Sequence, residues 1–196
     1  MKKRKKRNLK KMTQLYEVLP KEFIRLANSR SSGIGLVLSG CDLRSCALQL
    51  CGSNLEGVSF SRSLLDQMNL CYSKFKRGCF SRASLQGVVF HDAVLVEADF
   101  SFSDLRTADL SSANLFDASF RGANMVGVNL SNAQLHGVNF RDADLTGARL
   151  SGAVVDERTE MHSCNLSGVD LSGVFFDKPF ERHTTVPRGF FAKKIE

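Results

Sequence analysis

The chain has 196 residues, of which 43% are hydrophobic and none is tryptophan, and its formal net charge is +7 at pH 7. This length suits one domain with a sizeable core. Charge or glycine interrupts every apolar stretch, and no apolar run of the length that a secretory signal needs follows the first residues. The sequence therefore predicts neither a transmembrane span nor a secretory signal.

The positive charge is concentrated in residues 1–11. This segment holds eight Lys and Arg and no acid, so the rest of the chain sums to −1. We expect a basic, disordered tail that makes weak electrostatic contact with an anionic membrane or a nucleic acid, or that binds a nuclear import receptor. A solvated end without a ligand is the alternative. The candidate electrostatic residues are Lys2, Lys3, Arg4, Lys5, Lys6, Arg7, Lys10 and Lys11.

Residues 12–35 combine a short apolar pattern with a Ser- and Gly-rich connector. The spacing of Leu19, Phe23 and Leu26 suits a short amphipathic helix that begins near Pro20. The repeats that follow this segment, described next, indicate a coiled chain, or solenoid. Because a solenoid exposes an apolar interior and a backbone edge at its ends, it needs caps. We therefore predict an N-terminal helical cap and connector at 12–35. A helix that binds a partner is the alternative.

Residues 36–177 follow a five-residue period. From Leu55 to Val155 a large apolar residue occupies every fifth position: twelve Leu, seven Phe, one Met and one Val. A small or apolar residue stands two places before most of them. This period would spread the large residues over all faces of a helix, and in a flat strand it would turn every second repeat outward. The two apolar residues of each repeat must therefore point inward together, and the chain must bend before the next pair.

The bends and the number of sides can also be read from the sequence. Residues that tolerate tight turns or positive φ stand two places after the large residue. Phe60, Phe80, Phe100, Phe120 and Phe140 are twenty residues apart, which indicates four repeats per coil and a stack of rings about 4.8 Å apart. The pattern slips by two residues before Leu55 and by one residue at 156–161, where we expect bulged corners. The predicted turn residues are Gly57, Gly87, Gly122, Gly127, Gly137, Gly147, Gly152, Asp92, Asp117, Asn132 and Asp142.

Residues 178–196 form a short C-terminal segment. Pro179 and Pro187 exclude a long helix, and Phe180, Phe190 and Phe191 supply apolar side chains. The segment is interpreted either as a C-terminal cap that folds back on the solenoid or as a tail that carries a peptide motif for a partner.

The repeats resemble those of the pentapeptide-repeat family, written A-(D/N)-L-x-x. The match is close in Ala108-Asp109-Leu110 and Ala143-Asp144-Leu145, and the resemblance covers roughly residues 41–177. It implies an all-β solenoid, a right-handed quadrilateral β-helix with one pentapeptide on each side. Some members resemble secreted bacterial effectors that associate with host membranes or transport machinery. The best-understood activity of the family is binding to DNA gyrase by imitating duplex DNA.

The cysteines follow the repeat and not a metal motif. Three of them are five residues apart, whereas zinc sites space their ligands by two to four residues. We expect buried free thiols and hence a reducing compartment, the cytoplasm, or a host-cell cytosol if the protein is exported. The six cysteines are Cys41, Cys46, Cys51, Cys71, Cys79 and Cys164.

The remaining polar residues give no catalytic constellation. Neither His91 nor His136 is expected to have a Ser, Asp or Cys partner one coil away that would complete a nucleophilic relay. The place before the large residue accepts Asp and Asn alike, which favours hydrogen bonding over acid–base chemistry. We therefore predict a protein that is not an enzyme, with no catalytic residue, cofactor or metal.

One side of the predicted coil carries an apolar group on its outside. The twenty-residue spacing places Val96, Phe116 and His136 above one another, with Val94 beside them. We interpret these four residues as a candidate patch for a protein partner; an incidental cluster is the alternative. Charge is also banded along the axis, positive over residues 62–82 and negative over residues 91–120.

These features favour a non-enzymatic protein–protein interaction module or scaffold, in the form of a secreted bacterial effector with a membrane- or nucleic-acid-attracted basic tail. The alternative is a gyrase-binding DNA mimic of the quinolone-protection type. A mimic of DNA needs a strong negative field along most of its length. Residues 53–155 hold ten acids against nine bases, which meets that requirement poorly.

Overall fold

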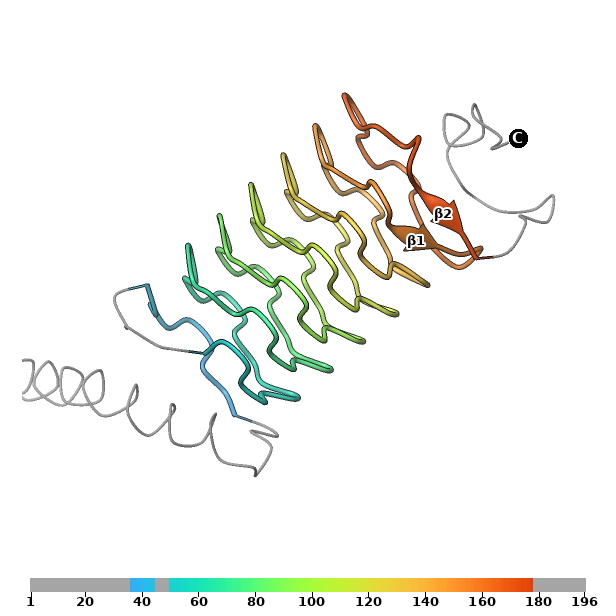
Figure 1. Cartoon of the computed structure of the whole chain (residues 1–196). Helices are drawn as coiled ribbons and strands as arrows, with labels where there is room; N and C mark the ends of the chain where they lie inside the picture. The colour runs from blue at the N-terminus through green and yellow to red at the C-terminus, as the bar shows by residue number, and fades with distance from the viewer. Residues whose placement is uncertain (1–35, 45–49, 178–196) are drawn as a thin grey trace, which may run out of the picture.

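The computed structural model describes residues 36–44 and 50–177, which wind into an elongated solenoid (Figure 1). Each outward residue pairs in parallel with the residue one coil later. This spacing is twenty residues from the pair Asn54 and Lys74 to the pair Gln134 and Val154. The prediction of four pentapeptides per coil is thus confirmed. Among the described residues, only two paired segments are long enough to be named strands, β1 (Val154–Val155) and β2 (Phe175–Phe176), and they are parallel, with Val154 opposite Phe175.

Each pentapeptide makes one side and one corner of the coil. In the repeat around Leu115, this residue and Ala118 are buried, while Asn114 faces outward and pairs with both neighbouring coils. The Ala118 amide donates to the Leu115 carbonyl at 3.0 Å across a turn in which Asp117 has a φ of 55°. Positive φ at the third residue of such a turn defines type II. All eleven turn residues predicted from the sequence have positive φ.

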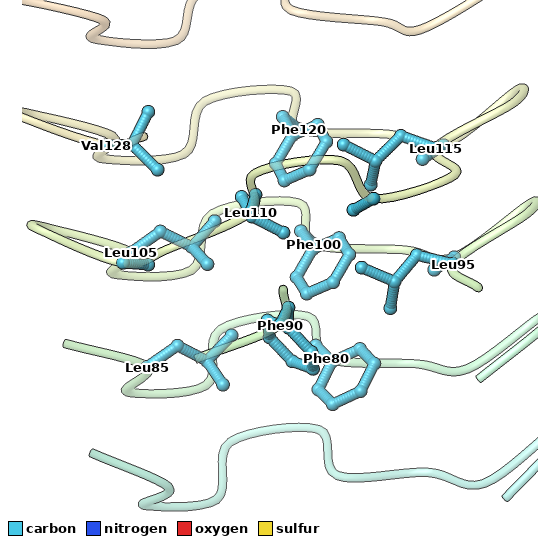
Figure 2. Close-up of a cluster of buried hydrophobic side chains, with 14 of the residues drawn as sticks. Phe80, Leu85, Phe90, Leu95, Phe100, Leu105, Leu110, Leu115, Phe120 and Val128 are labelled. Carbon is cyan, nitrogen blue, oxygen red and sulfur yellow. The ribbon is translucent and has the colours of Figure 1, made fainter. Parts of the chain in front are cut away.

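The core is a column of aromatic rings surrounded by leucines. Phe60, Phe80, Phe100, Phe120 and Phe140 are fully buried, and successive rings stack with centroids 5.5, 4.7, 4.8 and 5.4 Å apart. Figure 2 shows part of this column, with leucines from other sides of the coil packed beside it. The predicted stack is therefore confirmed.

Two further rings, Phe75 and Phe90, meet the column edge-on, with centroids 5.3 and 5.5 Å from that of Phe80. Gly78 fills the small inward position among them. A Cβ atom there would lie 2.9 Å from the Phe75 carbonyl oxygen and 3.1 Å from the Phe80 ring. Glycine at 78 therefore makes room for the crowded rings.

Both slips of the pattern appear in the pairing register. Val37 pairs with Ser59 and Asp42 with Leu64, twenty-two residues apart, so two extra residues enter between the described residues 44 and 50. Asn139 pairs with Glu160, twenty-one residues apart, so one extra residue enters at the corner between Val155 and Glu160. The Asp156 carboxylate fills this wider corner: its Oδ1 accepts the Gly137 amide at 2.8 Å, in the place of the usual carbonyl of the next coil.

The all-β solenoid accounts for the whole described part of the chain. The predicted tail at 1–11, the cap and connector at 12–35 and the tail or cap at 178–196 lie outside the described residues, so these three predictions stay predictions. Within 36–44 and 50–177, no helix has the length and apolarity needed to cross a membrane.

Candidate interaction surfaces

The four residues of the candidate patch lie together at one corner. This corner, named here the Phe116 corner, is formed by residues 56–57, 76–77, 96–97, 116–117 and 136–137 of successive coils. The rings of Phe116 and His136 stack with centroids 4.4 Å apart and planes within 8°. Val96 lies one coil earlier, and Val94 faces outward from the adjoining side. The geometry agrees with the stacking expected from the sequence, while binding of a partner there stays a prediction.

The patch is less exposed than the sequence suggests. Val94, Val96 and Phe116 are partly buried, and His136 is only 8% exposed. The reason is that Asp177, from a later coil, lies over His136, with its Oδ2 3.4 Å from Nε2 of the ring. Nδ1 of His136 is buried and has no hydrogen-bond partner among the described residues. The contact with Asp177 was not foreseen because the one-residue slip changes the spacing between these coils.

A short polar network closes the same corner. Arg158 donates from Nε to Asp156 at 2.9 Å and from Nη1 to Asp117 at 2.8 Å. Burial by itself would raise the pKa of Asp156. The hydrogen bonds from the Gly137 amide and the Thr159 hydroxyl, together with the Arg158 guanidinium, outweigh it and hold this pKa below its usual value. Asp156 is therefore a buried, hydrogen-bonded carboxylate that, together with Arg158, ties three coils together.

The expectation that His91 lacks relay partners is wrong. Its Nδ1 lies 2.8 Å from the Ser111 hydroxyl one coil later, and its Nε2 lies 2.9 Å from Oδ2 of Asp92. A serine nucleophile also needs free donors for the oxyanion. The two amides nearest the hydroxyl are already used, since Ser111 donates to Asp109 and Ser112 donates to the Ser131 carbonyl. These groups form a hydrogen-bond chain on the surface, and nothing else in their geometry indicates catalysis.

The expectation of free thiols is wrong for one pair of cysteines. Cys51 and Cys71 are joined by a disulfide, with Cα atoms 4.9 Å apart. Their twenty-residue separation places them in adjacent coils at the same corner, which the stacking rule could have revealed. A disulfide is unusual in a reducing compartment, so the cysteines no longer support the cytoplasmic location, which stays a prediction.

Three other cysteines are free as expected, but they are only partly buried and not fully buried as the sequence predicted: Cys41, Cys79 and Cys164. Burial raises the pKa of Cys41 and raises that of Cys164 to about 11, which keeps both thiols protonated at neutral pH. Cys46 lies outside the described residues. Among those that are described, no group of three His, Cys, Asp or Glu side chains could hold a metal ion.

Several charged side chains of the solenoid, some of them in the two charge bands, form ion pairs. Arg77 donates to Glu97 of the next coil at 2.7 Å, and Lys76 lies 4.0 Å from the same carboxylate. Arg44 donates twice to Asp42, and this hydrogen bonding lowers the pKa of the aspartate to about 2. The positive band predicted for residues 62–82 is thus partly cancelled at the Phe116 corner.

Comparison with known proteins identifies the family. The family described as "Pentapeptide repeats" matches the chain with eight copies over residues 49–87, 80–111 and 113–152, just over half of its length. No curated protein matches the sequence.

Three solved structures illustrate what the chain is similar to. The pentapeptide repeat protein alr5209 from Nostoc PCC 7120 is 31% identical, with 53% of this chain and 84% of that one covered and a TM-score of 0.47. Rfr23 from the cyanobacterium Cyanothece 51142 is 24% identical, with 72% and 91% covered and a TM-score of 0.41. Full-length QnrB1, a plasmid-mediated fluoroquinolone resistance protein, is 18% identical, with 74% and 92% covered and a TM-score of 0.43. Because the family model matches just over half of its length, the chain belongs to the pentapeptide-repeat family.

Proposed function

We propose that this protein is a non-enzymatic interaction module that binds a protein partner through the Phe116 corner and the side next to it. The observation that carries the proposal is the outward stack of Phe116 on His136, with Val96 beside it. Aromatic rings that are fixed in place and partly exposed are frequent anchors of protein interfaces, because they bury a large area at little cost in conformational entropy.

The adjoining side carries further apolar residues along the axis. Its outward column runs through Val94, Asn114, Gln134, Val154 of β1 and Phe175 of β2, so two polar residues separate Val94 from the apolar pair. Phe175 is 57% exposed. Because the ladder fixes the backbone of every coil, these side chains stand at constant spacing. Such a surface can meet a complementary partner without reorganising.

The test compares two pairs of substitutions in affinity capture followed by quantitative mass spectrometry. Val94→Asp with Val96→Asp places two charges on the proposed surface. Val89→Asp with Val126→Asp is the matched control, since both residues are outward, partly buried valines on other sides of the coil. A protein that is retained by the wild type and the control but lost from the first variant supports the proposal. Equal retention by the wild type and both variants contradicts it.

Two further parts of the proposed function, export and attraction to a membrane or a nucleic acid, are argued from the sequence alone. Export as a bacterial effector is proposed from the family resemblance, and attraction to a membrane or a nucleic acid from the charges of residues 1–11. Gyrase binding is less well supported, because residues 53–155 have nearly balanced charge and the likeness to QnrB1 reaches only the fold. Inhibition of gyrase supercoiling at stoichiometric protein would favour this alternative over the proposed module, whereas unchanged supercoiling at large excess would exclude it.

A further inference from the structure

A second corner of the solenoid carries a line of arginines. This corner, named here the Phe102 corner, is formed by residues 61–62, 81–82, 101–102, 121–122 and 141–142, and each of its five coils presents either an arginine or an aromatic ring. In axial order these are Arg62, Arg82, Phe102, Arg121 and Arg141, all of them exposed. These five side chains are named here the ridge. At about 4.8 Å per coil, the line is about 19 Å long.

These arginines are largely free of ion pairs. Arg62, Arg82 and Arg141 pair with no carboxylate among the described residues, and Arg121 only approaches Asp142, with Nε 3.8 Å from Oδ2. The Phe102 corner therefore holds four positive charges against one negative charge. Over the same coils, none of the other three corners has a net positive charge. The line is thus a local feature that the overall balance of charge conceals.

The side chains at this corner are placed against the preference of the backbone. Arg62, Arg82 and Phe102 have φ values of 59°, 58° and 60°, in the left-handed region where this family of turns otherwise uses many Gly, Asp and Asn residues. A fold that needed only a turn would be better served by glycine at each of these positions. The conformation directs these three large side chains outward, as it does those of Tyr72 and Arg77 at other corners.

Phe102 holds one of the arginines in position. The Arg82 guanidinium lies over the Phe102 ring, 5.3 Å from its centroid. On the opposite side the ring rests against Gly122, where an added Cβ atom would come within 2.7 Å of two ring carbons. The ring is still 53% exposed. A guanidinium fixed by a cation–π contact keeps its N–H donors available for an external anion.

We propose that the Phe102 corner binds the phosphate backbone of a single-stranded nucleic acid. Guanidinium groups aligned along the axis, two on each side of the Phe102 coil, match a polymer that carries one negative charge on every unit, and guanidinium pairs well with phosphate. A flexible single strand can follow a straight ridge, whereas the phosphates of a duplex follow a helical path. This binding is separate from the proposed protein partner, because it uses another corner.

The test measures the anisotropy of a fluorescent oligodeoxythymidine titrated with the full chain. The variant Arg62→Gln/Arg82→Gln removes two free guanidinium groups from the ridge. The control Arg44→Gln/Arg106→Gln removes the same charge from arginines that are already hydrogen-bonded to Asp42 and Asp104. Both variants keep residues 1–11, so any binding through that tail is common to both. Circular dichroism checks that each variant is folded.

We expect the ridge variant to bind roughly tenfold or more weakly than the wild type at about 0.1 M salt, and the control to stay within about twofold. The slope of log K against log salt should fall by about 1.4 in the ridge variant, as for two lost phosphate contacts on a single strand. Equal weakening in both variants, or no binding by the wild type, overturns the proposal. So does equal competition by polyglutamate, which would assign the ridge to an acidic protein, or tighter binding of a duplex of the same length.

Discussion

At the scale of single residues, Gly122 and Gly147 have the same backbone conformation but different surroundings. Both have a φ of 64°, yet a Cβ at Gly147 would meet no atom within 4 Å, whereas one at Gly122 would meet the Phe102 ring. We predict that Gly147→Ala lowers the free energy of unfolding by about 1 kcal/mol, the cost of positive φ for alanine. Gly122→Ala should cost about 1 kcal/mol more, because the Phe102 ring must move away from its contact with residue 122. Urea denaturation of the two variants measures the difference, and equal costs would show that the ring moves freely.

Asp156 gives a prediction about acid stability. Its folded pKa is below the usual value near 3.9, so the charged form stabilises the fold above that pH, and the contribution is lost as the pH falls through the folded pKa. Asp156→Asn removes the charge from a buried network. We expect a loss of about 1–3 kcal/mol of unfolding free energy at pH 7 and a smaller difference from the wild type at about pH 3.

Guanidinium denaturation at the two pH values measures this effect. Asp142→Asn is the control, because this aspartate is exposed at a neighbouring corner and only approaches Arg121. The control should resemble the wild type at pH 7 to within about 0.5 kcal/mol. A loss for Asp156→Asn that stays the same at both pH values would mean that the carboxylate charge has no part in closing the wide corner.

At the scale of elements, the ring column is the main support of each coil. Phe100 is fully buried between Phe80 and Phe120, with centroids 4.7 and 4.8 Å away. Phe100→Ala should lower the free energy of unfolding by about 3–5 kcal/mol, since the ladder above and below cannot collapse into the cavity. Phe102→Ala, two residues later and exposed, should cost less than about 1 kcal/mol. Thermal denaturation compares them, and similar costs would contradict a packed column.

The sequence predicted the fold because its signals are repeated many times. The phenylalanine series, the turn residues and both slips each follow from the spacing of apolar and turn-forming residues, so a single exception does not obscure them. The same twenty-residue rule also relates Cys51 to Cys71 and His91 to Ser111, so both contacts follow from the sequence. The Asp156 network was not predictable, because it depends on how a carboxylate turns inside a widened corner.

The candidate surfaces were less predictable than the core. Val96, Phe116 and His136 were placed correctly in one column, because that placement needs only the coil period. The burial of His136 depends in part on Asp177, which comes from a coil displaced by the slip. The coil period also places Glu97 one coil after Arg77 and Phe102 one coil after Arg82. The side-chain geometry then shows that Glu97 neutralises Arg77, whereas Arg82 stays available on the ridge.

At the scale of the whole molecule, stability should vary along the axis, since each coil contacts only its neighbours. The last described coil is the weakest part: Leu166, Val169 and Leu171 are only partly buried, whereas the corresponding residues of the middle coils are fully buried. The sequence left open whether residues 178–196 cap this coil or carry a peptide motif for a partner. Because a cap would protect the coil beneath it and not those further away, hydrogen exchange can separate the two interpretations.

We predict that deletion of residues 178–196 speeds amide exchange in residues 164–177 by roughly tenfold or more and leaves residues 100–120 unchanged. The second region is the internal control, since it lies several coils from the deletion. Faster exchange in both regions would mean that the solenoid unfolds as one cooperative unit, against the nearest-neighbour account. No change in either region would favour the peptide-motif interpretation, because a segment that leaves the exposed edge unprotected is free to bind a partner.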